Sequence, residues 1–141
     1  MTIDSFEGEY SWLSNFHPVE VKLGGEKYPS VEHAYQAAKT NDPEERREIK
    51  LLKKASLAKS KGKRVTMRKD WERVKLEVME NLLRQKFEDP TLRSQLLATG
   101  TEELVEGNWW GDVFWGVCRG EGKNHLGRLL MKVRTELQKK P

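Results

Sequence analysis

The spacing of hydrophobic residues predicts several helices along the chain. Segments 71–83 and 124–137 carry apolar residues three or four positions apart, which is the pattern of a helix with one buried face. Shorter helices are predicted behind residues that cap a first turn: from Ser30, from Asp42 to about Lys54, and between Asp89 and Gly100. A further short helix is predicted over Ala55–Lys61, ending at Gly62. Asp70 is the predicted cap of the first long helix. Helices therefore dominate the predicted fold.

Residues 1–29 have a different pattern, rich in aromatic and β-branched residues. The stretches "EYSWLSNF" and "VEVKL" are predicted to be extended, and "GGEK" is predicted to form a hairpin turn between "VEVKL" and "YPS". Later in the chain, "ELVEGN" and "VFWGVC" predict two further strands. We therefore predict an α+β fold: a single helix-dominated domain over residues 1–141, with a small antiparallel sheet.

Composition limits the classes of protein that the chain can represent. With 141 residues, of which 36% are hydrophobic, the chain suits one compact core. It has neither an apolar run of membrane-spanning length nor a basic segment followed by an apolar one near Met1, so we expect a cytoplasmic protein without a membrane partner. Its single cysteine, Cys118, and three scattered histidines lack zinc-ligand spacing, and no metal site is predicted.

Charge is distributed unevenly along the chain. Residues 46–75 contain 13 Lys and Arg against 3 Asp and Glu, whereas residues 76–121 contain 4 against 9. A concentrated basic surface attracts polyanions or phosphorylated ligands. A solvated helix face that keeps the protein soluble explains the same charges equally well, so charge alone leaves the partner open.

The stretch "SVEHAYQAAKT", residues 30–40, places several polar residues on one side of its predicted helix. Glu32, Gln36 and Lys39 form a row, with Tyr35 beside them. The positive end of the helix dipole favours an ionised Glu32, which suits stabilisation of positive charge or work as a base. Lys39 suits an ion pair with Glu32 or, if desolvated, attack on a sugar aldehyde. A solvated ladder of surface charges is the alternative for this helix.

Two stretches near the C-terminal end also carry candidate chemistry. "VEGNWWGDVFWGVC" combines three tryptophans with Asp112 and three glycines, which favours a loop that stacks nucleobases or sugars, although core packing gives the same composition. "CRGEGKNHLGRLL" places Lys123 and Asn124 where a glycine-rich loop enters a helix, a weak anion-binding signal without Walker or Rossmann spacing. Carboxylates, an amine, aromatic planes and such a loop together suit cleavage of a phosphorylated ribose at its anomeric carbon.

Four blocks of the sequence resemble the NADAR family, also called YbiA-like. They are "FEGEYSWLSNFHP", "YPSVEHAYQAAK", "GKRVTMRKDWERVK" and "GDVFWGVCRGEGKNHLGRLLMKVR", in the family's order over nearly the whole chain. The resemblance implies a YbiA-like fold and cleavage of N-glycosidic bonds in ribosylated compounds, with no cofactor. One branch of the family hydrolyses early intermediates of riboflavin synthesis. Another removes ADP-ribose from guanine in nucleic acid, sometimes as the antidote to a DNA ADP-ribosylating toxin.

The resemblance also implies site residues. Its functional core comprises Glu32, Trp71, Asp112 and Trp115, with Lys39 as a candidate catalytic amine; Asn124 and Gly127 are candidate ligand contacts, and Ser14, Asn15 and Phe16 shape the same pocket. Two routes remain open: a Schiff base between Lys39 and the opened ribose, or direct hydrolysis assisted by Glu32 and Asp112.

Three functional hypotheses follow. The first is a metal-independent glycosidase that removes ADP-ribose from guanine in nucleic acid, with segment 46–75 steering the polyanion. The second is a glycosidase of ribosylamino-pyrimidine phosphates from riboflavin synthesis. The third is a non-catalytic module that binds ADP-ribose or NAD. The chain lacks the fused reductase-like domains of some family members, which argues mildly against a dedicated riboflavin role, and its Trp109–Trp110 pair departs from the more polar residues of many relatives.

Overall fold

The computed structural model describes residues 1–140, which divide into two compact units. One unit is the continuous segment 15–86. The other combines both ends of the chain, residues 1–14 and the segment from Phe87 onward. Helices and short strands occur in both units, so the predicted α+β class with dominant helices is confirmed. That residues 1–141 act as a single domain stays a prediction.

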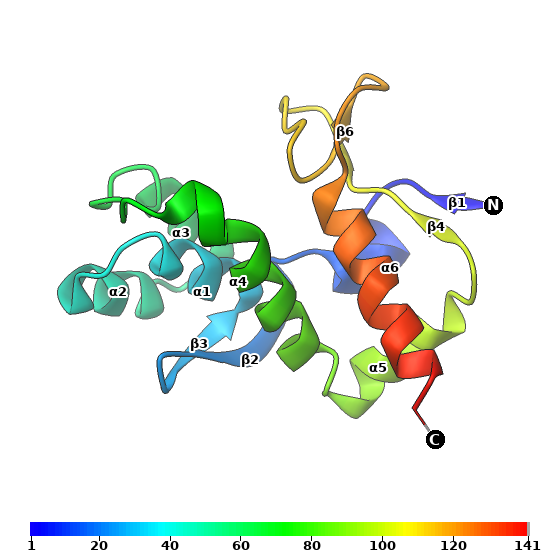
Figure 1. The fold of residues 1–141 in the computed structure, drawn as a ribbon, viewed down its shortest axis with the longest axis horizontal. Coiled ribbons are helices and arrows are strands. Elements are labelled where there is room, and N and C mark those ends of the chain that lie inside the picture. Colours follow the sequence, from blue (N-terminus) through cyan, green and yellow to red (C-terminus); the bar gives the residue numbers. More distant parts are fainter. Residues whose placement is uncertain (141) are drawn as a thin grey trace. The chain divides into compact units, whose positions relative to one another are not determined.

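The unit of residues 15–86 contains a hairpin and four helices (Figure 1). Strands β2 (Pro18–Leu23) and β3 (Glu26–Ser30) pair antiparallel, and helices α1 (Val31–Ala38), α2 (Pro43–Lys50), α3 (Ala55–Lys61) and α4 (Trp71–Lys86) follow. Leu23 pairs with Glu26 across the predicted turn, where Gly24 and Gly25 have φ of 57° and 82°. Glycine adopts this left-handed backbone without steric cost, which explains the confirmed hairpin.

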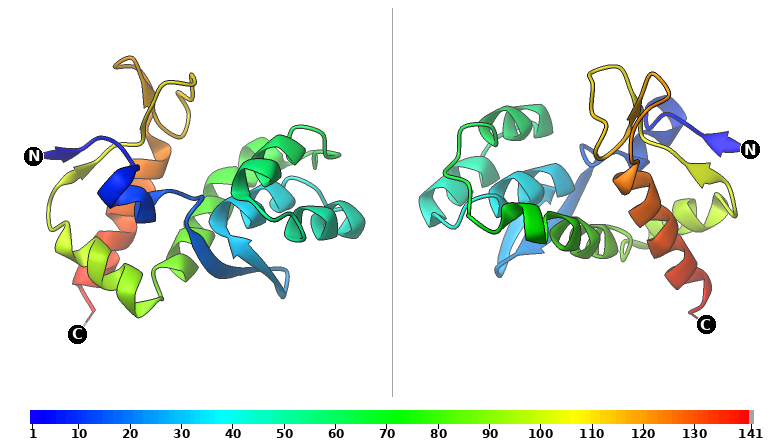
Figure 2. Two further views of the ribbon diagram at one scale, coloured as in Figure 1. Left: turned by 180° about the vertical axis from the view of Figure 1, so that it is seen from behind. Right: turned by 45° about the horizontal axis from the view of Figure 1, so that its top comes forward.

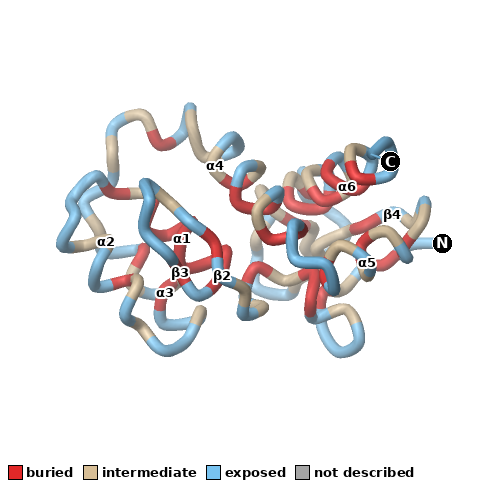
Figure 3. Tube along the Cα trace, turned by 90° about the horizontal axis from the view of Figure 1, so that it is seen from below, coloured by how far each residue is buried: buried red, intermediate tan, exposed pale blue. Residues whose placement is uncertain are grey.

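Helix α1 lies at the centre of this unit. It contacts α2, α3, α4, β2 and β3, and all eight of its residues are buried. Figure 3 shows this helix in the colour of buried residues. The interpretation of α1 as a solvated surface helix is therefore wrong, because its polar side chains lie inside the unit.

The other unit contains two short pairs of strands, a 3-10 helix and two α-helices (Figure 2). Its elements are β1 (Thr2–Ile3), the 3-10 helix η1 (Gly8–Leu13), α5 (Pro90–Ala98), β4 (Glu103–Leu104), β5 (Gly107–Asn108), β6 (Val117–Cys118) and α6 (His125–Gln138). Strand β1 pairs parallel with β4, and β5 pairs parallel with β6. Helix α6 contacts both α5 and β4. The predicted strands in "ELVEGN" and "VFWGVC" exist, but they are only two residues long each.

Three capping predictions are confirmed. The side chains of Ser30, Asp42 and Asp89 accept hydrogen bonds from the backbone N–H groups of first-turn residues, at 3.0, 2.9 and 3.0 Å. Each bond satisfies an amide that the helix cannot pair internally. At Asp70 the carboxylate instead accepts from the Arg68 guanidinium at 2.6 Å, while the Asp70 backbone carbonyl accepts from the N–H of Arg73.

Two element predictions are wrong. The stretch "EYSWLSNF" is not extended, because Gly8–Leu13 forms a 3-10 helix that buries Trp12 and Leu13; aromatic content suits either conformation. Helix α2 ends at Lys50 and not near Lys54. Lys54 has extended backbone angles and precedes α3, so residues 51–54 connect two helices and do not prolong one.

Candidate active site

The polar row of α1 is a buried hydrogen-bonded pair. Glu32 is 7% exposed and Gln36 is 4% exposed, and Nε2 of Gln36 donates to Oε2 of Glu32 at 2.6 Å. The backbone N–H of Glu32 donates to the carbonyl of Asn15 at 3.1 Å. Burial of a carboxylate is costly unless hydrogen bonds or opposite charge compensate it. Glu32 is therefore not one of the solvated carboxylates that merely make a protein surface polar.

Lys39 follows the last residue of α1 and is half-buried. Its ammonium group lies 5.7 Å from the centre of the Tyr35 ring. Burial lowers the pKa of Lys39, and the nearby Glu32 carboxylate opposes this shift. Three further cations of the same unit add to the lowering of the pKa: Lys75, Lys63 and Lys59. A lysine with a lowered pKa offers more neutral amine, the form that attacks a carbonyl or an imine.

Trp71 is a buried aromatic residue that packs on Tyr35. Its ring centroid is 5.2 Å from that of Tyr35, with the planes tilted by 56°, and the residue is 3% exposed. Trp71 begins α4 and packs against α1 through Tyr35, the ring over which the Lys39 ammonium group lies. Burial disfavours the charged form of Lys39, which explains the direction in which its pKa shifts.

Asn15 reaches the same cluster from the segment before β2. Its Nδ2 donates to Sδ of Met79 at 3.6 Å, and its buried Oδ1 has no hydrogen-bond partner within residues 1–140. The neighbouring Phe16 is 41% exposed. Ser14 belongs to the other unit, where its backbone N–H donates to the carbonyl of Ser11 at 3.0 Å. Of these three predicted residues, the structure places Asn15 against Glu32.

His33 has a structural role in α1. Its Nδ1 lies 2.7 Å from Oγ of Ser30, and its Nε2 lies 2.9 Å from the carbonyl of Leu52. Burial lowers the pKa of His33, which the Leu52 carbonyl opposes. With Nε2–H donating to that carbonyl, Nδ1 accepts from the serine hydroxyl, so the neutral ring satisfies both partners.

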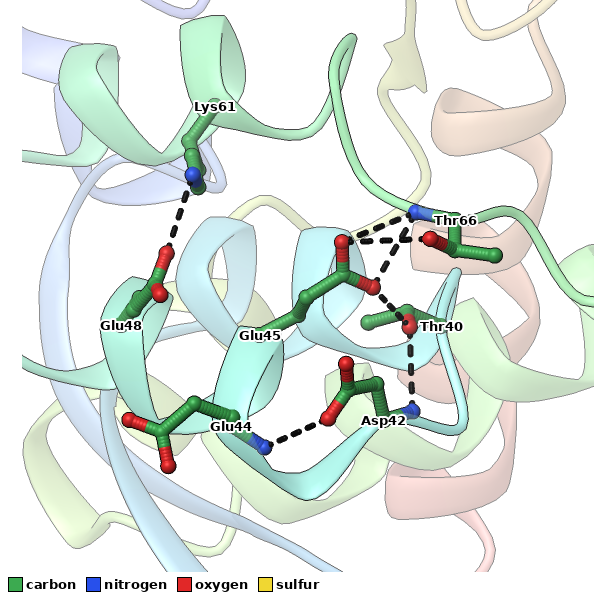
Figure 4. A network of polar contacts seen from close by, with 7 residues as sticks. All are labelled: Thr40, Asp42, Glu44, Glu45, Glu48, Lys61 and Thr66. Atoms are coloured by element: carbon green, nitrogen blue, oxygen red, sulfur yellow. Dashed lines mark hydrogen bonds and ion pairs between the residues drawn. The ribbon is translucent and has the colours of Figure 1, made fainter.

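Beyond Lys39 the chain borders an open hollow of about 520 Å³. Its lining residues are Thr40, Asn41, Asp42, Thr66, Met67, Arg68, Lys69 and Asp70. Figure 4 shows how Glu45 ties its two sides together: its carboxylate accepts from the Thr40 hydroxyl at 2.6 Å and from the Thr66 N–H at 3.1 Å. The lysine-rich segment before α4 is thereby fixed next to the end of α1.

In the other unit, Asp112 organises the loop that carries the tryptophans. Its Oδ1 accepts from the backbone N–H groups of Phe114 and Trp115 at 3.1 and 2.9 Å. Asn108 closes the same loop, because its Oδ1 accepts from the Asp112 N–H and its Nδ2 donates to the Asp112 carbonyl. Asp112 and Trp115 are both half-buried. A loop-building role for Asp112 is thus evident, and its catalytic role stays a prediction.

Asn124 and Gly127 lie at the start of α6 and hold neighbouring backbone. Nδ2 of Asn124 donates to the carbonyl of Leu104 at 2.9 Å, and its Oδ1 accepts from the Glu106 N–H at 3.0 Å. A Cβ atom at Gly127 would lie 2.1 Å from the Leu104 carbonyl oxygen, so only glycine fits there. The structure gives both residues packing roles, and their contact with a ligand stays a prediction.

The predicted site residues thus fall into two groups. Asn15, Glu32, Lys39 and Trp71 cluster within the unit of residues 15–86, whereas Asp112, Trp115, Asn124 and Gly127 belong to the other unit. The predicted site did not include Gln36, which donates a hydrogen bond to Glu32. The sequence did contain an indication of this contact, because residues 32 and 36 are one helical turn apart and therefore neighbours on the same helix face.

Two kinds of site are absent from residues 1–140. Their helices include none that is long and apolar enough to cross a membrane. Their His, Cys, Asp and Glu side chains form no group of three or more that could hold a metal ion. The cluster in the unit of residues 15–86 combines the Glu32 carboxylate, the Gln36 amide and the Lys39 amine, with the Tyr35 ring beside the amine.

Comparison with known proteins gives matches over nearly the whole chain. The family model of the NADAR domain matches residues 4–138. The chain is 40% identical over 137 residues to proteins named N-glycosidase YbiA from Shigella boydii and Escherichia coli K12, covering 94% of this chain and 85% of each relative. It is also 41% identical to a riboflavin biosynthesis protein of Vibrio vulnificus, of which it covers 36%.

A solved structure agrees with the fold. The NMR structure of E. coli YbiA superposes with a TM-score of 0.85 at 39% identity, covering 98% of this chain and 84% of that chain. The YbiA-like fold inferred from the sequence is confirmed. The names of the relatives agree with the expected class, hydrolases that act on N-glycosyl bonds. By the extent of these matches, the chain belongs to the NADAR domain family.

Proposed function

We propose that this chain is an N-glycosidase that removes ADP-ribose from guanine in nucleic acid. The observation that carries the proposal is the buried Glu32–Gln36 pair in the same cluster as Lys39, whose pKa burial lowers. An ionised carboxylate stabilises the positive charge that develops at an anomeric carbon. The family also includes proteins named N-glycosidase, and hydrolysis of an N-glycosyl bond can use both the Glu32 carboxylate and the Lys39 amine.

Two routes for the reaction use these residues. In direct hydrolysis, the bond between C1′ and the base nitrogen breaks, a carboxylate stabilises the cationic sugar, and water adds to C1′ while the base takes up a proton. In the alternative, the bond between C1′ and the ring oxygen breaks, which leaves C1′ as an imine of the base amine. The neutral amine of Lys39 adds to C1′ and the base amine leaves, so that C1′ becomes an imine of Lys39. Water then hydrolyses this imine to the sugar aldehyde and free Lys39. The lowered pKa of Lys39 supports the second route.

The charges of segment 46–75 support a nucleic-acid substrate. Six of its cations are exposed and form no ion pair with the described part of the chain: Arg47, Lys53, Lys54, Lys63, Arg64 and Lys69. Unpaired surface cations release counterions when they contact phosphates, which gives salt-dependent affinity. A DNA ADP-ribosyltransferase would produce the modified guanine. Such an enzyme would be the toxin that this chain counteracts, as the resemblance to one branch of the family implies.

A smaller substrate is the second candidate. It rests on the relatives named riboflavin biosynthesis proteins, from Vibrio vulnificus and from Zea mays, of which this chain covers 36% and 23%. A ribosylamino-pyrimidine phosphate has the same N-glycosyl bond but only one phosphate. Its turnover would respond weakly to salt, whereas cleavage of a modified oligonucleotide would fall steeply.

The deciding experiment compares both substrates in EDTA. The purified protein is incubated with an oligonucleotide that carries ADP-ribose on guanine, and free ADP-ribose and restored oligonucleotide are followed by mass spectrometry. We expect both products from the wild type and neither from Glu32→Gln. If the protein cleaves only the ribosylamino-pyrimidine phosphate, the second candidate function replaces the first. Tight ADP-ribose binding without any product would indicate a binding module.

A further inference from the structure

The amide of Gln36 is enclosed between a carboxylate and a glycine. On one side its Nε2 donates to Oε2 of Glu32 at 2.6 Å. On the other side its Oε1 faces Gly62, where an added Cβ atom would lie 1.8 Å from Oε1 and 2.6 Å from the side-chain amide carbon Cδ. Both residues are buried. A side chain at position 62 and the present placement of the amide are therefore mutually exclusive.

The carboxylate determines which way the amide points. A carboxylate oxygen only accepts, so the nitrogen end of Gln36 must face Glu32 and the oxygen end must face away. That oxygen is buried and has no hydrogen-bond partner in the part of the chain that the structure describes. Leaving a buried amide oxygen without a donor is unfavourable. Contact with the bare backbone of glycine compensates for this only weakly. The arrangement thus keeps the hydrogen bond from Gln36 Nε2 to Glu32, although it leaves Oε1 of Gln36 unpaired.

Conformational freedom does not explain the glycine at position 62. Its φ is −58° and its ψ is −21°, ordinary right-handed helical values at the end of α3. Alanine adopts these angles readily. The close approach of Gln36 is the remaining reason for the absence of a side chain.

We propose that Gln36 is a positioning residue for Glu32, and that Gly62 keeps the Gln36 amide in place. This inference rests on the proposed function, in which the Glu32 carboxylate stabilises positive charge at the anomeric carbon. A hydrogen bond to one carboxylate oxygen fixes the plane in which the other oxygen points. Catalytic groups act efficiently only when neighbouring side chains hold their orientation.

Alanine at position 62 tests this idea without removing any polar group. The added methyl group displaces the Gln36 amide, while the helical backbone and the flexible end of Gln36 let the fold persist. We expect kcat to fall roughly 10- to 100-fold, the value of a hydrogen bond to a charged group, with KM nearly unchanged. Ser60→Ala, an exposed position in the same helix, is the matched control and should keep full activity.

A double variant separates displacement of Gln36 from general damage. Gln36→Ala should lower kcat to a similar extent, and it vacates the space that the methyl group at position 62 would need. Gly62→Ala combined with Gln36→Ala should therefore be no worse than Gln36→Ala alone. Additive losses, or full kcat in Gly62→Ala with its melting temperature unchanged, would overturn the proposal.

Side-chain NMR tests the geometry independently of activity. The amide NH2 resonances of Gln36 should shift in Glu32→Ala, which removes the acceptor, and also in Gly62→Ala, which displaces the donor. If the wild type cleaves neither substrate, the proposed function fails while these shifts still support the contact between the three residues. Unshifted resonances in both variants would overturn the positioning role even in an active enzyme.

Discussion

Oδ1 of Asp112 accepts a hydrogen bond of 2.9 Å from the backbone N–H of Trp115. The same oxygen accepts from the N–H of Phe114 at 3.1 Å, so this carboxylate closes the loop that presents both aromatic residues. A short polar side chain that bonds to the backbone two or three residues onward is a common turn device. Any chemical role of Asp112 therefore comes in addition to a structural one.

Two substitutions separate these roles. Asn at position 112 retains an oxygen that accepts both backbone N–H groups but carries no charge, whereas Ala removes the acceptor. If the carboxylate is catalytic, Asp112→Asn lowers kcat by about 100-fold or more at an unchanged melting temperature. Asp112→Ala should lower both kcat and the melting temperature. An Asn variant with wild-type kcat would limit Asp112 to building the loop.

Reductive trapping tests the amine route through Lys39. Burial lowers the pKa of Lys39 from its usual 10.5, so neutral amine appears at a lower pH than for an exposed lysine. With substrate and cyanoborohydride, we expect a stable adduct on the peptide that contains Lys39. Its yield should increase as the pH rises towards the lowered pKa of Lys39. Peptide mapping by mass spectrometry identifies the site. Lys69→Met, at an exposed position, is the control, and no adduct in wild type with full kcat in Lys39→Met would establish direct hydrolysis.

Lys86 gives a pH dependence of stability. It is fully buried at the end of α4, and burial lowers its pKa from 10.5 to about 7. Between these values the unfolded chain binds a proton that the folded protein releases, so the free energy of unfolding rises with pH from about 7 to 10.5. Below pH 7 the penalty is fully present and on the order of a few kcal/mol.

Substitution by methionine removes this penalty. Lys86→Met should raise the free energy of unfolding by about 1–3 kcal/mol near neutral pH, and the difference from wild type should shrink as the pH approaches 10.5. Urea unfolding at several pH values measures it. A pH-independent difference would show that Lys86 stays charged in the folded protein.

The exposed cations at Lys53 and Lys54 test the choice of substrate, because neither contributes to the lowered pKa of Lys39. Replacing both by alanine should raise KM for a modified oligonucleotide and leave kcat unchanged. The slope of log affinity against log salt should fall by about one for each phosphate that the variant no longer neutralises. Kinetics at several salt concentrations measure both effects. Lys27→Ala changes a cation on the hairpin, outside the basic segment, and should have little effect. Equal effects of all three changes would indicate general attraction and not a nucleic-acid path.

Local rules predicted the parts of this fold that local contacts determine. The helix starts behind Ser30, Asp42 and Asp89 depend on bonds to amides two or three residues away, which the sequence displays directly. The hairpin turn and the long helices α4 and α6 follow the same logic. The resemblance to NADAR proteins supplied the site residues, including those that the structure places around α1.

Distant contacts account for what the sequence could not show. The polar row of α1 has the spacing of a surface helix, but the helix is buried because α2, α3 and α4 surround it. Both ends of the Asn124 amide bond to the backbone near Leu104, about twenty positions earlier in the chain, and no local pattern predicts that. At Gly62 the glycine indicates a helix end, whereas its proximity to Gln36 appears only in three dimensions.

The division of the chain into units also sets an order for its synthesis. Residues 15–86 are continuous, so the helices and strands of this unit that contact α1 are synthesised before α6. Strand β1 must wait much longer, because Ile3 pairs with Leu104. Domains fold as their residues emerge, and pairing between distant segments is slow. The segment that holds Glu32 and Lys39 can thus assemble early, while the first residues to be translated are among the last to find their partners.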